Sequence, residues 1–239
     1  MSNTVRVELE PGFILHSRSY RETSVILEVF TQGFGRAGLV ARGARRPRSA
    51  MRGLLNPFQP LRLSWSGRGE LATLRAVEPG GIFSALSGDS VMAGFYVNEL
   101  LMKLLHRFDP HPNLFAHYAA LLAQLASGDQ LEASLRNFEL DLLREIGYEL
   151  NLECEAVTHE PLRADQNYEF RIELGAVAAE HSADQVTHFS GADLLAIGRG
   201  DFAEAGKLRS AKRLLRNVLD YHLGGKGLQT RRIASAMKR

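Results

Sequence analysis

Arginines are concentrated in one stretch of this sequence, at residues 36–53. The stretch contains six arginines and no acidic residue: Arg36, Arg42, Arg45, Arg46, Arg48 and Arg52. No Asp or Glu occurs between Glu28 and Glu70, and the only formal charges in those 41 residues are eight arginines. Guanidinium groups without acidic neighbours are available to bind an external polyanion, and nucleic acid is the commonest extended polyanion in a cell. The stretch therefore predicts a phosphate-binding surface, with a solvated basic loop as the alternative.

The overall formal charge of +2 conceals a strong asymmetry along the chain. Residues 1–80 carry 12 basic and 6 acidic groups, residues 81–206 carry 7 and 20, and residues 207–239 carry 10 and 1. The net charges of these three parts are therefore +6, −13 and +9. Basic surfaces on both sides of an acidic middle are typical of a protein that binds a polyanion through only part of its surface.

The glycines that open the arginine stretch match a nucleotide-binding pattern without its context. Gly33, Gly35 and Gly38 have the spacing G-x-G-x-x-G. A dinucleotide-binding loop is followed by a helix and, about 20 residues later, by an acidic residue that binds the ribose. Here strand-like Leu39-Val-Ala follows, and no acidic residue occurs before Glu70. We therefore predict that these glycines form a hairpin turn.

The other reactive residue types form no catalytic or metal-binding pattern. His106, His111 and His117 lie on both sides of a proline-containing break, and their spacing fits no helical zinc pair. Cys154 is the only cysteine, and the acidic residues on both sides of it disfavour its thiolate. The sequence also contains no G-x-S-x-G and no phosphate-loop motif. We expect a binding protein with no catalytic residue, no metal ligand and no cofactor.

The first 80 residues predict a small β-barrel. Strand-like runs separated by turn residues occur at residues 5–9, 13–16, 25–30, 39–42, 61–65 and 71–77. Five or six short strands in a domain of this length favour a barrel such as the oligonucleotide/oligosaccharide-binding (OB) fold. Phe34, Phe58 and Trp65 lie near the arginines and could stack on bases. Because a small barrel needs large side chains inside, we expect all three in the core.

After residue 80 the hydrophobic period becomes that of helices. Helices are predicted at residues 90–107, 113–126, 129–147, 191–198 and 207–222, and the clearest strand at 168–174. The predicted fold class is α+β and multidomain: an N-terminal OB-fold β-barrel, then a mainly α-helical domain with a small irregular or β subdomain lacking zinc. The predicted divisions are residues 1–80, 81–150, 151–205 and 206–239. The last comprises a basic helix on the helical domain and a mobile basic tail.

We expect neither a signal peptide nor a membrane-spanning segment. Its N-terminus has no basic region followed by an apolar one, which argues against a signal peptide. The longest strongly apolar segment, residues 91–105, is interrupted by Asn98, Glu99 and Lys103. We expect a cytoplasmic, nucleoid-associated protein with no membrane partner.

Several segments resemble the bacterial DNA repair family RecO. From about residue 13 to residue 230 they follow the same order as in that family: LHSRSYRETSVILEVFT at 15–31, LVARGAR at 39–45, NPFQPL at 56–61, YVNELL at 96–101, FELDLL at 138–143, LRSAKR at 208–213 and LGGK at 223–226. The resemblance implies an OB domain, a helical domain and a third region that often carries a four-cysteine zinc site. This chain departs from it there, because Val157 stands where the partner cysteine of Cys154 would be.

The resemblance implies a recombination mediator that binds single- and double-stranded DNA and anneals complementary strands. Such proteins engage RecR and bind the acidic C-terminal tail of single-stranded DNA-binding protein (SSB), and thereby help RecA to load on SSB-coated DNA. Arg42 and Arg45 match basic positions used for DNA and RecR, and Arg136 and Arg209 match the tail-binding pocket. We expect the remaining arginines of the stretch to bind DNA as well. Leu135, Leu208, Lys212 and Arg213 are expected to complete the pocket, with packing in the core as the alternative role of the two leucines.

Two other functions are compatible with the same residues. One is an adaptor that mainly recruits proteins and binds DNA weakly. The other is an OB-type RNA-binding protein, because base stacking and phosphate contacts serve RNA equally well. Titration of the SSB tail onto an Arg209→Glu variant tests the first, and a comparison of DNA and RNA oligomers tests the second.

Overall fold

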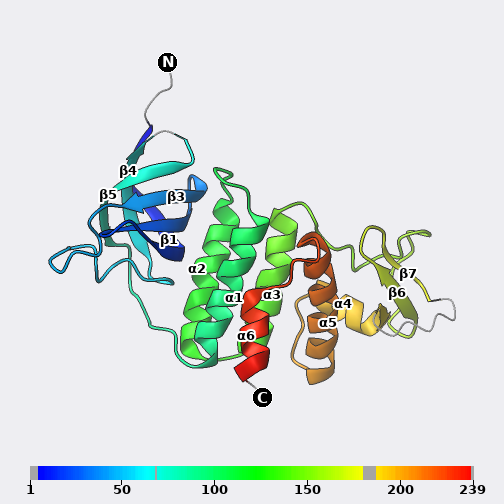
Figure 1. Cartoon of the computed structure of the whole chain (residues 1–239). Coiled ribbons are helices and arrows are strands. Elements are labelled where there is room, and N and C mark those ends of the chain that lie inside the picture. Colours follow the sequence, from blue (N-terminus) through cyan, green and yellow to red (C-terminus); the bar gives the residue numbers. More distant parts are fainter. Residues whose placement is uncertain (1–4, 68, 180–186, 238–239) are drawn as a thin grey trace. The chain divides into compact units, whose positions relative to one another are not determined.

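The computed structural model describes residues 5–67, 69–179 and 187–237, so Lys238 and Arg239 of the predicted tail lie outside the described residues. The elements follow in chain order (Figure 1): β1 (Val5–Tyr20), β2 (Ser24–Thr31), β3 (Gly35–Ala41), β4 (Leu61–Gly67), β5 (Leu71–Pro79), α1 (Asp89–Leu104), α2 (Pro112–Ser127), α3 (Leu131–Glu145), β6 (Asn167–Arg171), β7 (Gly175–Ala178), β8 (His188–Ser190), α4 (Gly191–Gly198), α5 (Ala205–His222) and α6 (Gln229–Met237). The chain divides into two compact units, residues 1–129 with 228–239 and residues 130–227. None of the described helices combines the length and apolar character needed to span a membrane.

The five strands of the first unit close into a barrel, which confirms the predicted OB-like fold. The strand order is β1-β2-β3-β5-β4, with β3 and β5 parallel and the other pairs antiparallel. Alternate side chains of each strand fill the interior. Phe58 and Trp65 are buried, as predicted, whereas Phe34 is 36% exposed and packs edge-to-face on Trp65 with ring centroids 5.4 Å apart.

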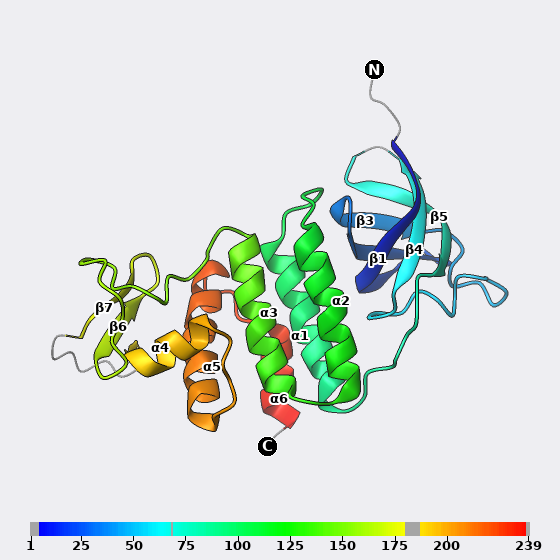
Figure 2. The ribbon, with the colours of Figure 1, turned by 180° about the vertical axis from the view of Figure 1, so that it is seen from behind.

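Helices α1 and α2 pack against each other, and α1 also contacts β1 of the barrel (Figure 2). The buried Asn98 side chain donates to the Leu15 carbonyl oxygen at 2.9 Å and accepts from the Tyr118 hydroxyl at 2.6 Å. Burial raises the pKa of Tyr118. The rings in contact around this pair come from both barrel and helix: Phe13, Phe30, Phe115 and Tyr118. A satisfied polar pair inside an apolar contact fixes one arrangement of barrel and helices.

The segment that follows α1 binds along β3 and explains the glycine pattern. The glycines open the β2–β3 hairpin, as predicted from the sequence. Gly35 has a φ of 62°, and a Cβ there would lie 2.0 Å from the carbonyl oxygen of Asp109. A Cβ on Gly38 would lie 2.8 Å from Nη1 of Arg107. The backbone N–H of Phe108 also donates to the Arg36 carbonyl oxygen at 2.9 Å. These two glycines are therefore needed for close approach of the chain and not for a nucleotide.

Arg36 differs from the other arginines of its stretch because it has internal partners. Its Nη1 donates to the carbonyl oxygen of Met102 at 2.6 Å. Burial lowers the pKa of Arg36, the nearby Glu28 carboxylate raises it, and Arg107 lowers it. Arg107 in turn forms an ion pair with Glu28. The sequence shows no acidic residue near these arginines, but Arg36 nevertheless has internal partners because the segment after α1 folds back onto β3.

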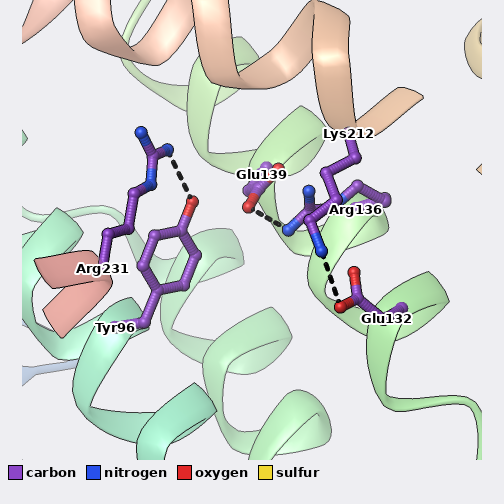
Figure 3. A network of polar contacts seen from close by, with 6 residues as sticks. All are labelled: Tyr96, Glu132, Arg136, Glu139, Lys212 and Arg231. Carbon is purple, nitrogen blue, oxygen red and sulfur yellow. Dashed lines mark hydrogen bonds and ion pairs between the residues drawn. The ribbon is translucent and has the colours of Figure 1, made fainter. Parts of the chain in front are cut away.

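Helix α6 lies against α1, at residues where the sequence predicts a mobile tail (Figure 1). The Glu99 carboxylate accepts from the backbone N–H groups of Gln229 and Thr230, both at 2.9 Å, and from the Thr230 hydroxyl at 2.8 Å. Arg231 donates to the Tyr96 hydroxyl at 3.2 Å and lies over its ring (Figure 3). A carboxylate satisfies the free N–H groups at a helix N-terminus and complements the helix dipole. Glu99 thus acts as the cap that the local sequence of α6 does not supply.

We expect Glu99→Ala to loosen α6 from α1 at a cost of about 1 kcal/mol, the usual cost of losing a helix cap. Burial alone would raise the pKa of Glu99, but hydrogen bonds from Thr230 and Gln229 outweigh it, and the pKa lies below its ordinary value of 4.5. The stabilisation is therefore complete above pH 4.5 and is lost as the pH falls through the lowered pKa. Hydrogen exchange of residues 229–237, corrected for intrinsic rate, is expected to accelerate in the variant at pH 7. Arg232→Ala leaves the cap intact and serves as the control; equal exchange in both variants would contradict the capping role.

The second unit combines α3, α4 and α5 with a small antiparallel sheet. The sheet order is β7-β6-β8. The inward face of α5 is formed by Ala211, Leu214, Leu215, Val218 and Leu219. This face packs α5 against α3 and α4. The sequence prediction is confirmed for the helices at 191–198 and 207–222 and for the strand near residue 168. The strands β7 and β8 are too short to be recognised in the sequence.

Candidate nucleic-acid interface

The arginines that follow β3 lie on the loop between β3 and β4, which extends away from the barrel in both views (Figures 1 and 2). We call residues 42–53 the arginine loop. Its backbone forms three successive turns, in which N–H groups donate to carbonyl oxygens three residues earlier. The bonds run from Arg46 to Gly43 at 3.1 Å, from Ser49 to Arg46 at 3.0 Å and from Arg52 to Ser49 at 3.2 Å. The arginine loop therefore has a defined path.

Apolar residues anchor the arginine loop to the barrel. Ala44 is 3% exposed and belongs to the barrel core. Met51, Leu54 and Leu55 are partly buried and pack against that core. The backbone N–H of Arg45 donates to the carbonyl oxygen of Thr23, between β1 and β2, at 2.9 Å. The apolar positions thus hold the loop, and its charged positions are left for solvent.

Five of the six arginines predicted to bind DNA are exposed: Arg42, Arg45, Arg46, Arg48 and Arg52. Within the described residues, none of these five side chains has a hydrogen bond or an ion pair. Close like charges repel one another, and a bound polyanion would relieve the repulsion. The sixth, Arg36, is directed to the carbonyl oxygen of Met102 and does not share this surface.

The residues predicted to bind an acidic protein tail lie on α3 and α5, which pack against each other in the second unit. Arg209 and Lys212 are exposed, and Leu208 is half-buried. Lys212 Nζ pairs with a carboxylate oxygen of Glu132 at 2.9 Å, which joins the two helices (Figure 3). Arg209 has no ion pair with any residue that the structure describes. It is therefore the cation of α5 best placed to meet an external carboxylate.

The other three predicted tail-binding residues are directed to the protein. Arg136 is 5% exposed and pairs with Glu139 at 2.6 Å (Figure 3), and Leu135 is also buried. Arg213 donates to the carbonyl oxygen of His188, and its guanidinium lies 4.2 Å from the ring centre of Phe189. The family resemblance grouped these residues with Arg209, but it could not show that the guanidinium groups of Arg136 and Arg213 already have partners within the protein.

The region around Cys154 does not fit the four-cysteine zinc site that the family resemblance implies. Cys154 offers one thiol, and the exposed Val157 offers no metal ligand. No group of three or more His, Cys, Asp or Glu in the described residues could hold a metal ion. The neighbouring Glu155 carboxylate is instead hydrogen-bonded. The Thr158 hydroxyl and backbone N–H lower the pKa of Glu155 against the opposing effect of burial.

Comparison with known proteins identifies the family. The family models described as "Recombination protein O N terminal" and "Recombination protein O C terminal" match residues 5–83 and 86–232. The DNA repair protein RecO of Dechloromonas aromatica is 47% identical over 233 residues, which cover 95% of each chain. That of Methylococcus capsulatus is 46% identical, with 95% of this chain and 93% of the relative covered. That of Aromatoleum aromaticum is 43% identical, with 100% and 99% covered. The chain therefore belongs to the RecO family of DNA repair proteins.

Proposed function

We propose that this protein binds single- and double-stranded DNA through the arginine loop and anneals complementary strands without catalysing a covalent step. The observation that carries the proposal is the set of five exposed arginines without internal partners on an anchored loop. Guanidinium groups form charge-assisted bonds with phosphate oxygens. Because the loop is anchored, its backbone loses little conformational freedom on binding.

The same surface suits annealing because two DNA strands repel each other through their phosphates. Arginines that neutralise several phosphates lower this repulsion and release condensed counterions. The bases stay free to pair, because phosphate contacts do not engage base edges. Family membership supports placing this activity in recombination, where the protein would act with RecR to promote RecA loading on SSB-coated DNA.

Strand annealing tests the proposal directly. Two complementary oligonucleotides, one with a fluorophore and one with a quencher, are coated with SSB and mixed without nucleotide or metal. We expect the wild-type protein to accelerate quenching, and a variant with alanine at the five exposed loop arginines to lose most of the acceleration. An unchanged rate on addition of the wild-type protein would exclude annealing.

We propose further that α5 binds the acidic C-terminal tail of SSB. Arg209 and Lys212 supply exposed cations on one face of the helix, and Leu208 supplies adjacent, half-buried apolar surface. In the family that this chain resembles, the bound tail ends in acidic residues and a phenylalanine, so it needs both kinds of contact. Leu135 and Arg136 are buried, so we assign them to support of this surface and not to direct contact.

We expect Arg209→Glu to weaken binding of the tail peptide at least about tenfold, because an attractive charge becomes repulsive. Titration of a labelled peptide followed by anisotropy measures the affinity. Arg216→Glu makes the same charge change on an exposed residue of α5, two turns away, and is expected to have a much smaller effect. Equal affinity in the wild type and in Arg209→Glu would move the tail site elsewhere.

A further inference from the structure

Residues 153–162 form a small hairpin at the place where the family resemblance implies a metal site. The N–H of Glu155 donates to the carbonyl oxygen of Glu160 at 2.8 Å, and the N–H of Leu162 donates to that of Glu153 at 2.8 Å. Cys154 and Pro161 form the bridge between these two bonds. The chain must therefore reverse direction within the few residues between Glu155 and Glu160.

The Glu155 side chain holds the tip of this hairpin. One carboxylate oxygen accepts from the backbone N–H groups of Val157 at 3.1 Å and of Thr158 at 2.5 Å. Glu155 is only 8% exposed, although Val157 and Thr158 at the tip are exposed. The carboxylate therefore lies inside the turn, where it satisfies N–H groups that cannot pair across so tight a reversal.

Neighbouring contacts fix the rest of the hairpin without a metal ligand. The Asn151 side-chain oxygen accepts from the N–H groups of Glu153 and Cys154, both at 3.2 Å. The N–H of Ala156 donates to the carbonyl oxygen of Ala176 in β7 at 2.7 Å. The Asn151 amide thus holds the base of the hairpin, and the Glu155 carboxylate holds its tip. A backbone hydrogen bond to β7 attaches the hairpin to the sheet.

A structural zinc ion stabilises a short turn by binding thiolates from both of its ends, and that stabilisation is part of the folding free energy. This turn has a single thiol, on Cys154. We propose that the Glu155 carboxylate replaces a metal ion as the group that organises this turn, so that the region folds without a metal ion. Residues of this turn also line part of an open pocket of about 970 Å³, together with residues of β6 and β7.

Hydrogen exchange of residues 151–162 in the full-length protein tests this inference. In Glu155→Ala the N–H groups of Val157 and Thr158 lose their acceptor, and we expect their exchange to accelerate at least about tenfold. In the wild-type protein, a zinc chelator is expected to leave exchange in this segment unchanged. Glu153→Ala removes an exposed carboxylate two residues away and is the matched control, with exchange expected at the wild-type rate.

The inference would be overturned by wild-type protection in Glu155→Ala, or by loss of protection when the chelator is added to the wild type. If Glu155→Ala does not fold, Glu155→Gln takes its place, because glutamine keeps a carbonyl acceptor but removes the negative charge. We expect exchange in Glu155→Gln between that of the wild type and complete loss of protection. Full protection in that variant would show that the charge plays no part.

Discussion

Replacing Arg42 and Arg45 by alanine is expected to lower the affinity for single-stranded DNA about 25-fold at 0.1 M salt. For single-stranded DNA, each phosphate contact raises the affinity by roughly 0.7 log units when the salt concentration falls tenfold, counted from 1 M. Two contacts therefore account for roughly 1.4 log units, or about 25-fold, at 0.1 M salt. Neither side chain has an internal partner among the described residues, so the double substitution should weaken DNA binding without a cost in stability. Anisotropy of a labelled oligonucleotide gives the affinity, and the unfolding midpoint verifies the stability.

The matched control changes the same net charge elsewhere on the barrel. Arg6→Ala with Arg75→Ala removes two exposed arginines of β1 and β5, which interact with Glu8 and with Ser66. We expect this variant to bind within about threefold of the wild type, because net charge at a distance is screened by salt. An equal loss in both variants would mean that overall charge, and not the arginine loop, determines binding.

Gly35→Ala is expected to destabilise the first unit by about 3 kcal/mol. Two effects add: an alanine at a φ of 62° is strained, and its Cβ would lie 2.0 Å from the carbonyl oxygen of Asp109. The segment that follows α1 must then move away from β3, which breaks the hydrogen bond from Phe108 to Arg36. Urea unfolding followed by fluorescence of Trp65 in the barrel measures the loss.

Gly53→Ala is the control for this substitution. A Cβ at Gly53 would meet no atom within 4 Å, so we expect a change of less than about 0.5 kcal/mol. Similar stability in the two variants would show that β3 and the segment after α1 separate easily. That result would remove the explanation given above for the glycine spacing.

The barrel and the longer helices could be predicted because their signals are local. Alternating apolar residues in β4 and the leucine spacing of α5 each place one face inward, and the structure buries those faces. The hairpin at Gly33 and Gly35 could be predicted because the sequence after these glycines lacks the helix and the acidic residue that a dinucleotide-binding loop requires. Such features depend on residues that lie close together in sequence.

The features that could not be predicted depend on contacts between distant parts of the chain. Helix α6 is capped by Glu99, which lies 130 residues before Gln229, so its own sequence carries little start signal. Arg36 differs from Arg42 only because Met102 and Arg107 return to β3. The sequence shows how many arginines the stretch contains and in what order, but it does not show which of them have partners within the protein.

For the residues predicted to bind the SSB tail, helical spacing alone was similarly insufficient to show which side chains are exposed. It placed Arg209 and Arg213 four residues apart, close to one face of α5. The structure leaves Arg209 exposed and engages Arg213 with His188 and Phe189. Whether a helical arginine is free depends on what packs beside it, and β8 carries no pattern strong enough to predict that.

The central claim, that the arginine loop is the main phosphate-binding surface, is tested most directly by the salt dependence of single-stranded DNA binding. For five phosphate contacts, the logarithm of the wild-type affinity should fall with the logarithm of salt at a slope of about −3.5, a loss of roughly 100-fold between 50 and 200 mM. With alanine at Arg42, Arg45, Arg46, Arg48 and Arg52, the slope should shrink to about −1 or less in magnitude. A wild-type slope near zero, or an unchanged slope in the variant, would contradict the claim.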